Sequence, residues 1–279
     1  MSVRIIVDST ADMTAAVKEQ VKIVPLTVHF GEEEYKDGVT MDFVQFYEKL
    51  ESCEELPTSS QPNPATFEDV YEEVIKEGDD AVVITISSKL SGTCQSATIA
   101  AGDYDNIYVV DGGTAAIGTG ILAELAIGLA AEGLSAKEIA DRLNEEKKNV
   151  KIVALIDTLE FLQRGGRISK AVALAGGVLS IKPIISVDGG VIEMVSKVRG
   201  MKQGFKQLGG EAEKMGEIDF SKPVMLGFTG KTPENLEKYE ENYAEYWGQA
   251  AGGYGKAALG SVIGTHIGPG AVAAAFFVK

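Results

Sequence analysis

One segment near residue 80 constrains the fold more than any other part of the chain. Residues 81–86 are apolar or β-branched, which is typical of a strand buried on both faces. The hydroxyls of Ser87, Ser88 and Ser91 follow, and after Gly92 the residues become small and compatible with a helix. The sequence therefore predicts a strand, a polar loop and a helix N-terminus, which attracts carboxylates and phosphates. A serine-rich cap that binds nothing fits the same pattern.

Two other segments repeat this arrangement. Residues 5–7 form an apolar run after Arg4 and before the polar segment 8–12, and residues 107–110 form another before Asp111 and two glycines. Strands that alternate with helices at this spacing pair in parallel, and their carboxyl ends lie at one edge of the sheet. We therefore expect the polar loops of the first half to meet at a single ligand-binding edge.

A change of pattern near residue 150 indicates a second domain. Residues 182–195 are typical of a β-hairpin, in which Asp188 and two glycines supply the turn. A chain of 279 residues is also long enough for two domains. The expected fold is α/β: a parallel α/β domain over residues 1–149 that carries the anion-binding loops, and an α+β domain with antiparallel strands over residues 150–279 that closes over the ligand.

The composition argues against several classes of function. A net charge of −15 disfavours nucleic acids and anionic membrane surfaces, because both require a basic face. No apolar run reaches the length of a membrane span, and residues 1–7 resemble a strand rather than a signal peptide, so we expect a cytoplasmic protein. Cys53 and Cys94 are too few for a disulfide framework or a zinc site.

His266 is the titratable residue whose surroundings are most distinctive. Glycine and proline surround it over residues 264–270, so backbone there can approach a ligand closely. An imidazole in this setting can serve as a general base, a metal ligand or a donor to an anion. A metal is disfavoured, because Asp8, Asp12 and Asp111 would have to bind a hard cation by themselves.

Ser91, His266 and an aspartate supply the parts of a hydrolase. An esterase or thioesterase that uses Ser91 and His266 is therefore the alternative function, although the Gly-x-Ser-x-Gly motif is absent. Neither a phosphate-binding loop of the ATPase type nor a dinucleotide fingerprint occurs in the required context. The residues favour anion capture over catalysis, with no cofactor and no metal.

Six segments of the chain, in order, resemble the signature blocks of the DegV family. They are residues 8–12, 57–62, 87–93, 159–169, 181–183 with 197–199, and 264–270. The resemblance implies a two-domain α/β protein that holds one long-chain fatty acid between its domains, with the carboxylate on a polar floor. It further implies the fatty-acid-binding subunit of a bacterial fatty acid kinase. Such a subunit presents the carboxylate to a separate ATP-binding subunit, which makes an acyl phosphate for phospholipid synthesis.

The resemblance also implies which residues bind the carboxylate. They are Ser91, the N–H of Gly92, a hydroxyl of the loop that contains Thr58 and Ser59, and His266. Family members usually have Thr-Ser-Gln-Pro where this chain has Ser59-Ser60-Gln61-Pro62, so the ligating hydroxyl of that loop stays open between Ser59 and Thr58. Several donors are expected, because a carboxylate in a partly dry site must replace its lost hydration.

A basic set of residues resembles the family region that meets the kinase. Its members are Arg167, Lys197, Arg199 and Lys202. No acidic residue interrupts the last three, which is unusual in so acidic a chain. A solvated basic turn is the alternative. Cys94 replaces the aromatic residue that the family usually carries at this position, and the smaller side chain is expected to alter local packing.

The position of the acyl chain follows from two segments rich in glycine and alanine, residues 115–129 and 171–179. Small side chains on facing elements leave a channel, although close-packed helices give the same composition. Each buried methylene contributes about 0.8 kcal/mol, so a long chain brings on the order of 10 kcal/mol before ordering costs. A long-chain acid is therefore favoured over a short polar one.

Overall fold

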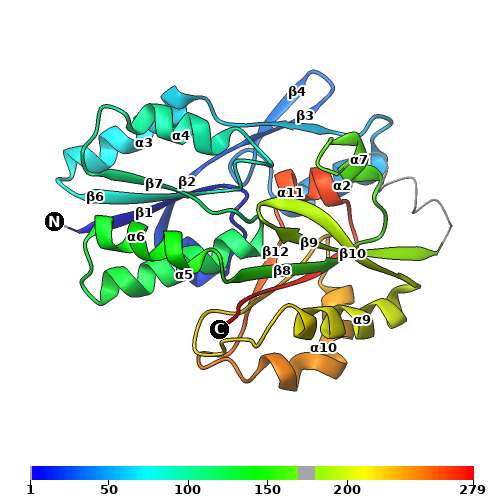
Figure 1. Cartoon of the computed structure of the whole chain (residues 1–279). Helices are drawn as coiled ribbons and strands as arrows, with labels where there is room; N and C mark the ends of the chain where they lie inside the picture. Colours follow the sequence, from blue (N-terminus) through cyan, green and yellow to red (C-terminus); the bar gives the residue numbers. More distant parts are fainter. Residues whose placement is uncertain (1, 169–179) are drawn as a thin grey trace.

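The computed structural model describes residues 2–168 and 180–279, which form three β-sheets with helices packed around them (Figure 1). The first sheet is parallel and has the order β2-β1-β6-β7. Its strands are β1 (Val3–Asp8), β2 (Val21–Val24), β6 (Asp80–Thr85) and β7 (Ile107–Asp111). The predicted parallel sheet of the first half is therefore confirmed, and its polar strand ends lie at one edge.

Helices cover both faces of the parallel sheet (Figure 1). On one face α3 (Pro64–Lys76) and α4 (Thr93–Ala101) bury Phe67 and Tyr71 against the strands. On the other face lie α5 (Ile117–Ala131) and α6 (Ala136–Glu146). Ser135 caps α6 in a capping box with Glu138, which satisfies two N-terminal groups of the helix.

The second sheet has six strands in the order β10-β9-β8-β13-β11-β12. They are β8 (Val150–Leu155), β9 (Ile181–Asp188), β10 (Val191–Arg199), β11 (Met225–Phe228), β12 (Gly255–Ala258) and β13 (Val272–Phe277). All neighbours pair antiparallel except β11 and β12. The predicted hairpin is confirmed: Asp188 pairs with Val191, and both turn glycines have positive φ. Helices α9 (Met201–Lys214) and α10 (Glu234–Trp247) cover one face (Figure 1).

The third sheet corrects one expectation about the first half. Residues 21–30 are expected to form one strand, but the chain divides at Pro25, which has no N–H for a ladder. The second piece, β3 (Thr27–Phe30), pairs with β4 (Glu33–Lys36) and β5 (Thr58–Ser60) in a small antiparallel sheet. Helix α2 (Phe43–Ser52) and the α11 helix (Ser261–Ile267) pack beside it, with Phe46 and Val262 in one core. The remaining short helices are α1 (Ala15–Lys18) and α7 (Glu160–Arg164).

One apolar core extends across the predicted domain boundary. Helix α5 lies between the parallel sheet and the six-stranded sheet, and Ile5, Val82, Ile152 and Ala273 belong to the same cluster. Strand β8 does begin at Val150, but the boundary between residues 149 and 150 stays a prediction because the core is shared. Among residues 2–168 and 180–279, no helix has both the length and the apolar character that a membrane crossing needs.

Candidate functional site

An apolar cavity lies where the carboxyl edge of the parallel sheet faces the six-stranded sheet. Its empty volume is about 770 Å³, which includes the open space at its mouth. Aliphatic side chains form most of its wall, and about half of them come from β8, β9, β13 and α11. Polar side chains also line it, namely Thr10, Ser59, Ser91, Arg167, Ser186 and His266. An apolar cavity with a few polar groups is the usual form of a small-molecule site.

The side chains of Ser59 and His266 are in hydrogen-bond contact although the residues are 207 positions apart in the sequence. Ser59 Oγ lies 2.8 Å from His266 Nε2. Ser59 pairs with the fully buried Val28, so its side chain is on the inner face of β5. Ser60 points to the opposite face, where its hydroxyl contacts a ring nitrogen of His29 at 2.8 Å. Thr58 is exposed and lines a second pocket outside the cavity, so the geometry favours Ser59 as the hydroxyl of this loop.

The environment of His266 keeps its imidazole neutral. Burial, and after it the positive charge of Arg167, lowers the pKa of His266 to about 4. Among the described residues its Nδ1 atom is buried without a hydrogen-bond partner. Gly165 makes this close packing possible, since a Cβ at that position would lie 2.4 Å from Nδ1. A neutral imidazole with its proton on Nε2 can donate one hydrogen bond towards Ser59 and the cavity.

Arg167 lines the same cavity as Ser59 and His266, which the sequence does not indicate. Its side chain is half-buried at the cavity wall, where Nε donates to the carbonyl of Leu90 at 3.1 Å and another N–H donates to the carbonyl of Gly165. The guanidinium is therefore fixed beside His266. Its predicted contact with a partner stays a prediction. Sequence reasoning missed the position of Arg167 in the cavity lining, because that position depends on its packing against a loop 77 residues away.

Ser91 and Gly92 lie at the start of α4, as predicted. Ser91 lines the cavity, and its hydroxyl is 2.8 Å from that of Thr93. Gly92 is next to the cavity lining and occupies the N-cap position of α4 without a side-chain cap. A Cβ on Gly92 would lie 2.2 Å from Gln61 Oε1, so the glycine lets the loop of residues 57–62 approach this helix. The two signature segments therefore pack together around the same cavity.

Ser91 and His266 are not arranged as the nucleophile and base of a hydrolase. No hydrogen bond joins Ser91 to His266 within the described parts of the chain, and Nδ1 of His266 has no carboxylate partner there. A serine nucleophile needs a base within hydrogen-bond reach, and that base needs an orienting group. Likewise, residues 2–168 and 180–279 contain no group of three His, Cys, Asp or Glu side chains placed to hold a metal ion.

The cavity closes where the β9–β10 hairpin meets the loop after β6. Ser87 Oγ donates to the carbonyl of Gly190 at 2.7 Å, and Ile192 packs against Ile86 and Leu90. Beneath them, Ala116 lines the cavity with a positive φ of 52°, which costs an alanine conformational energy. The backbone is thus held in an unfavourable conformation at the cavity wall.

Only one end of the first segment predicted to line an acyl channel lines the cavity. Ala115 and Ala116, just before α5, line the cavity, but Ile121 and Leu122 of the same segment are fully buried in the core. Residues 171–179 lie outside the described residues. The small side chains that leave room are instead Ala154 of β8 and Ala273 of β13, which pair directly. The sequence does not show which residues of these strands face the cavity, because a strand buried on both faces has no alternation of apolar and polar residues.

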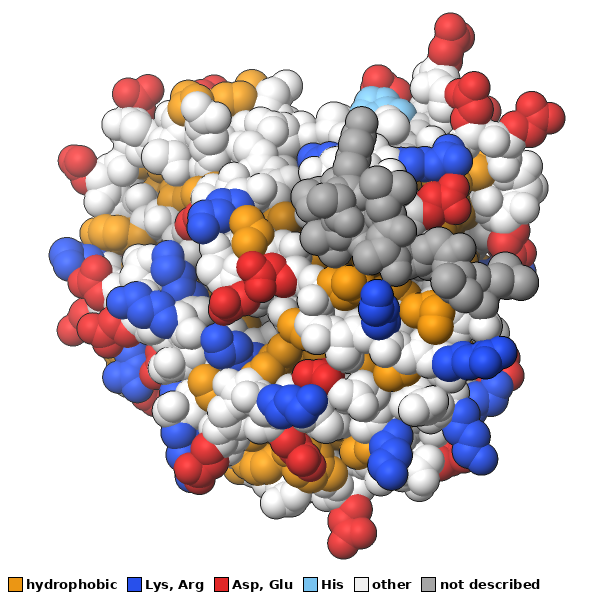
Figure 2. Space-filling view, turned by 45° about the vertical axis from the view of Figure 1, so that its right-hand side comes forward, with side chains coloured by type: hydrophobic (Ala, Val, Ile, Leu, Met, Phe, Trp, Pro, Cys, Tyr) orange, Lys and Arg blue, Asp and Glu red, His pale blue; other side chains and the backbone are white. Residues whose placement is uncertain are grey.

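Three of the four basic residues assigned to a partner do not line the cavity. Lys197 and Arg199 are exposed on β10, and Lys202 is exposed on α9. The face in Figure 2 carries Lys and Arg side chains with Asp and Glu side chains between them.

Comparison with known proteins supports one family. The family model described as uncharacterised protein, DegV family, matches residues 2–279. The chain belongs to the DegV family. Protein DegV of Bacillus subtilis is 34% identical over 277 residues, which is 98% of each chain. The family resemblance of the six sequence segments is therefore confirmed.

Solved structures with the same fold are described as lipid-binding proteins. A DegV family protein from Thermus thermophilus, described by its fatty acid binding, has a TM-score of 0.89 and 28% identity, with 100% of each chain covered. DegV from Bacillus subtilis, described as a fatty acid binding protein, has a TM-score of 0.83 and 33% identity over 100% of each chain. A stearic acid-binding protein from Eubacterium ventriosum has a TM-score of 0.82 and 26% identity, covering 99% of this chain and 98% of its own.

Proposed function

We propose that this chain binds one long-chain fatty acid in the cavity. The observation that carries the proposal is an apolar cavity with Arg167, His266, Ser59 and Ser91 together in its lining. A fatty acid has the same division, with one charged end and a long apolar tail. The fatty acid binding described for DegV family structures from two other bacteria supports this assignment.

In this proposal the head group is held by charge and by hydrogen bonds. The guanidinium of Arg167 supplies the positive charge, and the hydroxyls of Ser59 and Ser91 donate to the carboxylate. Neutral His266 donates from Nε2, and the N–H of Gly92 at the start of α4 is a further donor in this proposal. The aliphatic wall then buries the chain, and this burial supplies most of the affinity.

We further propose that the protein presents its bound carboxylate to a separate ATP-dependent fatty acid kinase and has no catalytic activity alone. A second pocket shares Ser59, Arg167 and His266 with the cavity. Phe161 and Arg164 form part of its outer wall. The carboxylate would thus lie just below the surface, where a partner could transfer phosphate to it for phospholipid synthesis in the cytoplasm.

The basic residues of β10 support a contact with this partner. Strand β10 has a bulge between Met194 and Ser196, and a bulge changes the face to which later side chains point. Met194 pairs with Ile185, whose side chain lines the cavity, and after the bulge Lys197 and Arg199 point to that same face. We propose that these two residues, with Lys202 and Arg167, meet the kinase.

Native mass spectrometry of the purified chain tests the binding proposal. We expect a complex heavier than the denatured chain by one fatty acid, and an organic extract that contains the same acid. A protein that stays at its bare mass after incubation with palmitate or stearate would contradict the proposal. Incubation with acyl esters separates the hydrolase alternative, because steady turnover that is lost in Ser91→Ala would identify an esterase.

A further inference from the structure

Helix α11 forms one wall of the cavity but begins without a cap of its own. Gly260 occupies its N-cap position and makes no side-chain hydrogen bond. Val262, Ile263 and His266 of this helix line the cavity, so the placement of α11 decides where the imidazole lies. The first N–H groups of a helix require acceptors, and here distant parts of the chain must supply them.

Two buried carboxyl groups provide these acceptors. The N–H of Gly260 donates to Asp12 Oδ1 at 2.8 Å, and the N–H of Ser261 donates to Asp37 Oδ1 at 3.0 Å. Asp12 follows β1, whereas Asp37 follows β4. Both carboxyl groups lie against one residue, since a Cβ on Gly260 would be 3.4 Å from Asp12 Oδ1 and 3.3 Å from Asp37 Oδ1.

The second oxygen of each carboxyl group lacks a partner. Asp12 is 6% exposed and Asp37 is 5% exposed, and among the described residues neither Oδ2 atom has a hydrogen bond. The buried carboxylate of Asp8 differs, because its Oδ1 accepts the N–H of Thr10 and its Oδ2 accepts the N–H of Ile86. Burial raises the pKa of all three groups, but both oxygens of Asp8 accept hydrogen bonds, whereas Oδ2 of Asp12 and of Asp37 accepts none from the described residues.

The surroundings do not neutralise two charges at this place. The titratable groups that face the pair are Asp8, Lys18, Asp42 and Tyr47. Only Lys18 among them is cationic, and its side chain is exposed. Burial raises the pKa of Asp12 well above its ordinary value and also raises the pKa of Asp37, and the charge of Asp37 adds to the shift at Asp12.

We propose that Asp12 and Asp37 hold one proton between them and together position α11, so that loss of this proton loosens the helix that carries His266. Two adjacent carboxylates in a dry site repel each other, and one proton removes this repulsion while leaving both Oδ1 acceptors in place. Asp12 and Asp37 are thus positioning residues for ligand binding. This inference rests on the proposed binding of a fatty acid.

Palmitate affinity of the full chain between about pH 6 and about pH 10 tests the proposal. As the pH rises, the shared proton leaves, so we expect the wild type to weaken at least about tenfold. Asp12→Asn keeps an oxygen for the N–H of Gly260 and has no charge, so its affinity should change less than about twofold over this range. Asp42→Asn, an exposed carboxylate beside the pair, is the matched control and should follow the wild type.

If the palmitate affinity of Asp12→Asn falls with pH in parallel with that of the wild type, the proposal of a shared proton is wrong. Asp37→Asn provides the same comparison if Asp12→Asn does not fold. A wild type that binds no palmitate at any pH contradicts the proposed function instead. In that case the melting temperature of the ligand-free chain decides the inference. It should fall with rising pH in the wild type and stay level in Asp12→Asn, and an equal fall in both would overturn it.

Discussion

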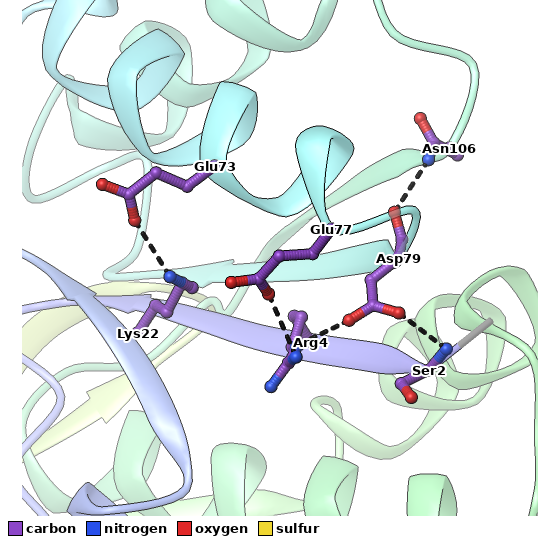
Figure 3. A network of polar contacts seen from close by, with 7 residues as sticks. All are labelled: Ser2, Arg4, Lys22, Glu73, Glu77, Asp79 and Asn106. Atoms are coloured by element: carbon purple, nitrogen blue, oxygen red, sulfur yellow. Dashed lines mark hydrogen bonds and ion pairs between the residues drawn. The ribbon is translucent and has the colours of Figure 1, made fainter.

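The two ends of the parallel sheet use polar side chains in opposite ways. At the amino end, Asp79 accepts the N–H of Ser2 at 2.9 Å and the Nε–H of Arg4 at 2.7 Å (Figure 3). Arg4 also pairs with Glu77, and Asn106 donates to the backbone carbonyl of Asp79 at 3.0 Å. These groups, including the buried Asp79, satisfy one another by hydrogen bonds and ion pairs.

At the carboxyl end, by contrast, several buried polar groups have a hydrogen-bonding atom without a partner among the described residues. Nδ1 of His266 and Oδ2 of Asp12 have no partner within the described residues, and Ser91 faces the cavity. Unpaired buried groups cost stability, so they are retained where they bind or position something. The comparison indicates that function lies at the end where polar groups do not satisfy one another.

The largest predicted effect concerns the length of the fatty acid, because the apolar wall at the carboxyl end should supply most of the affinity. Each methylene removed from the ligand should weaken binding about fourfold, so octanoate should bind more than about a thousandfold more weakly than palmitate. Isothermal titration with a series of saturated acids measures this slope. Equal affinity for octanoate and palmitate would show that the cavity does not hold the tail.

The second prediction uses the depressed pKa of His266, which is about 4 in the folded chain and about 6.5 when unfolded. Between these values only the unfolded chain binds the proton, so His266 should remove roughly 3 kcal/mol of stability as the pH falls from 6.5 to 4. Urea unfolding of the ligand-free wild type and His266→Gln measures it. The variant should lose less stability over this range, and identical pH slopes would contradict the burial of a neutral imidazole.

The third prediction concerns the charge at the cavity wall. Arg167→Met keeps much of the apolar stem but removes the guanidinium, and we expect palmitate affinity to fall about tenfold to a hundredfold. Arg164→Met is the matched control, because Arg164 is exposed and pairs with Glu160. The control should bind palmitate within about twofold of the wild type. Equal losses in both variants would show that Arg167 has no specific contact with the ligand.

The smallest effect is expected at the amino end of the sheet. Glu77→Gln removes one exposed partner of Arg4, and exposed ion pairs contribute little to stability. Palmitate affinity should stay within about twofold, and the melting temperature should stay within about 2 °C. Differential scanning fluorimetry with and without palmitate checks both. A clear loss of palmitate affinity in this variant would show that the amino end of the sheet also contributes to ligand binding.

Local patterns predict those parts of the fold that depend on neighbouring residues. The apolar run before Ser87 indicates a buried parallel strand, and the capping box at Ser135 marks the start of α6, because both signals are local. The family resemblance, rather than any local pattern, implies that Ser91 and His266 share a site, and both residues line the cavity.

Other features depend on contacts between distant segments and cannot be predicted from such patterns. Pro25 divides an apolar segment between two sheets, and only the pairing of β3 with β5 shows that Ser59 points inward rather than Thr58. The cap that Asp37 gives to Ser261 joins residues 224 positions apart. No local signal predicts a contact of that length, since the pairing depends on the packing of three separate segments.

A crystal structure with a palmitate that carries bromine at its methyl end tests the central claim most directly. The account predicts the carboxylate within hydrogen-bond distance of Arg167, Ser59 and His266. The bromine should lie deep in the cavity, against the paired alanines of β8 and β13. A carboxylate at the opposite end of the cavity, or a ligand bound outside it, would contradict the account.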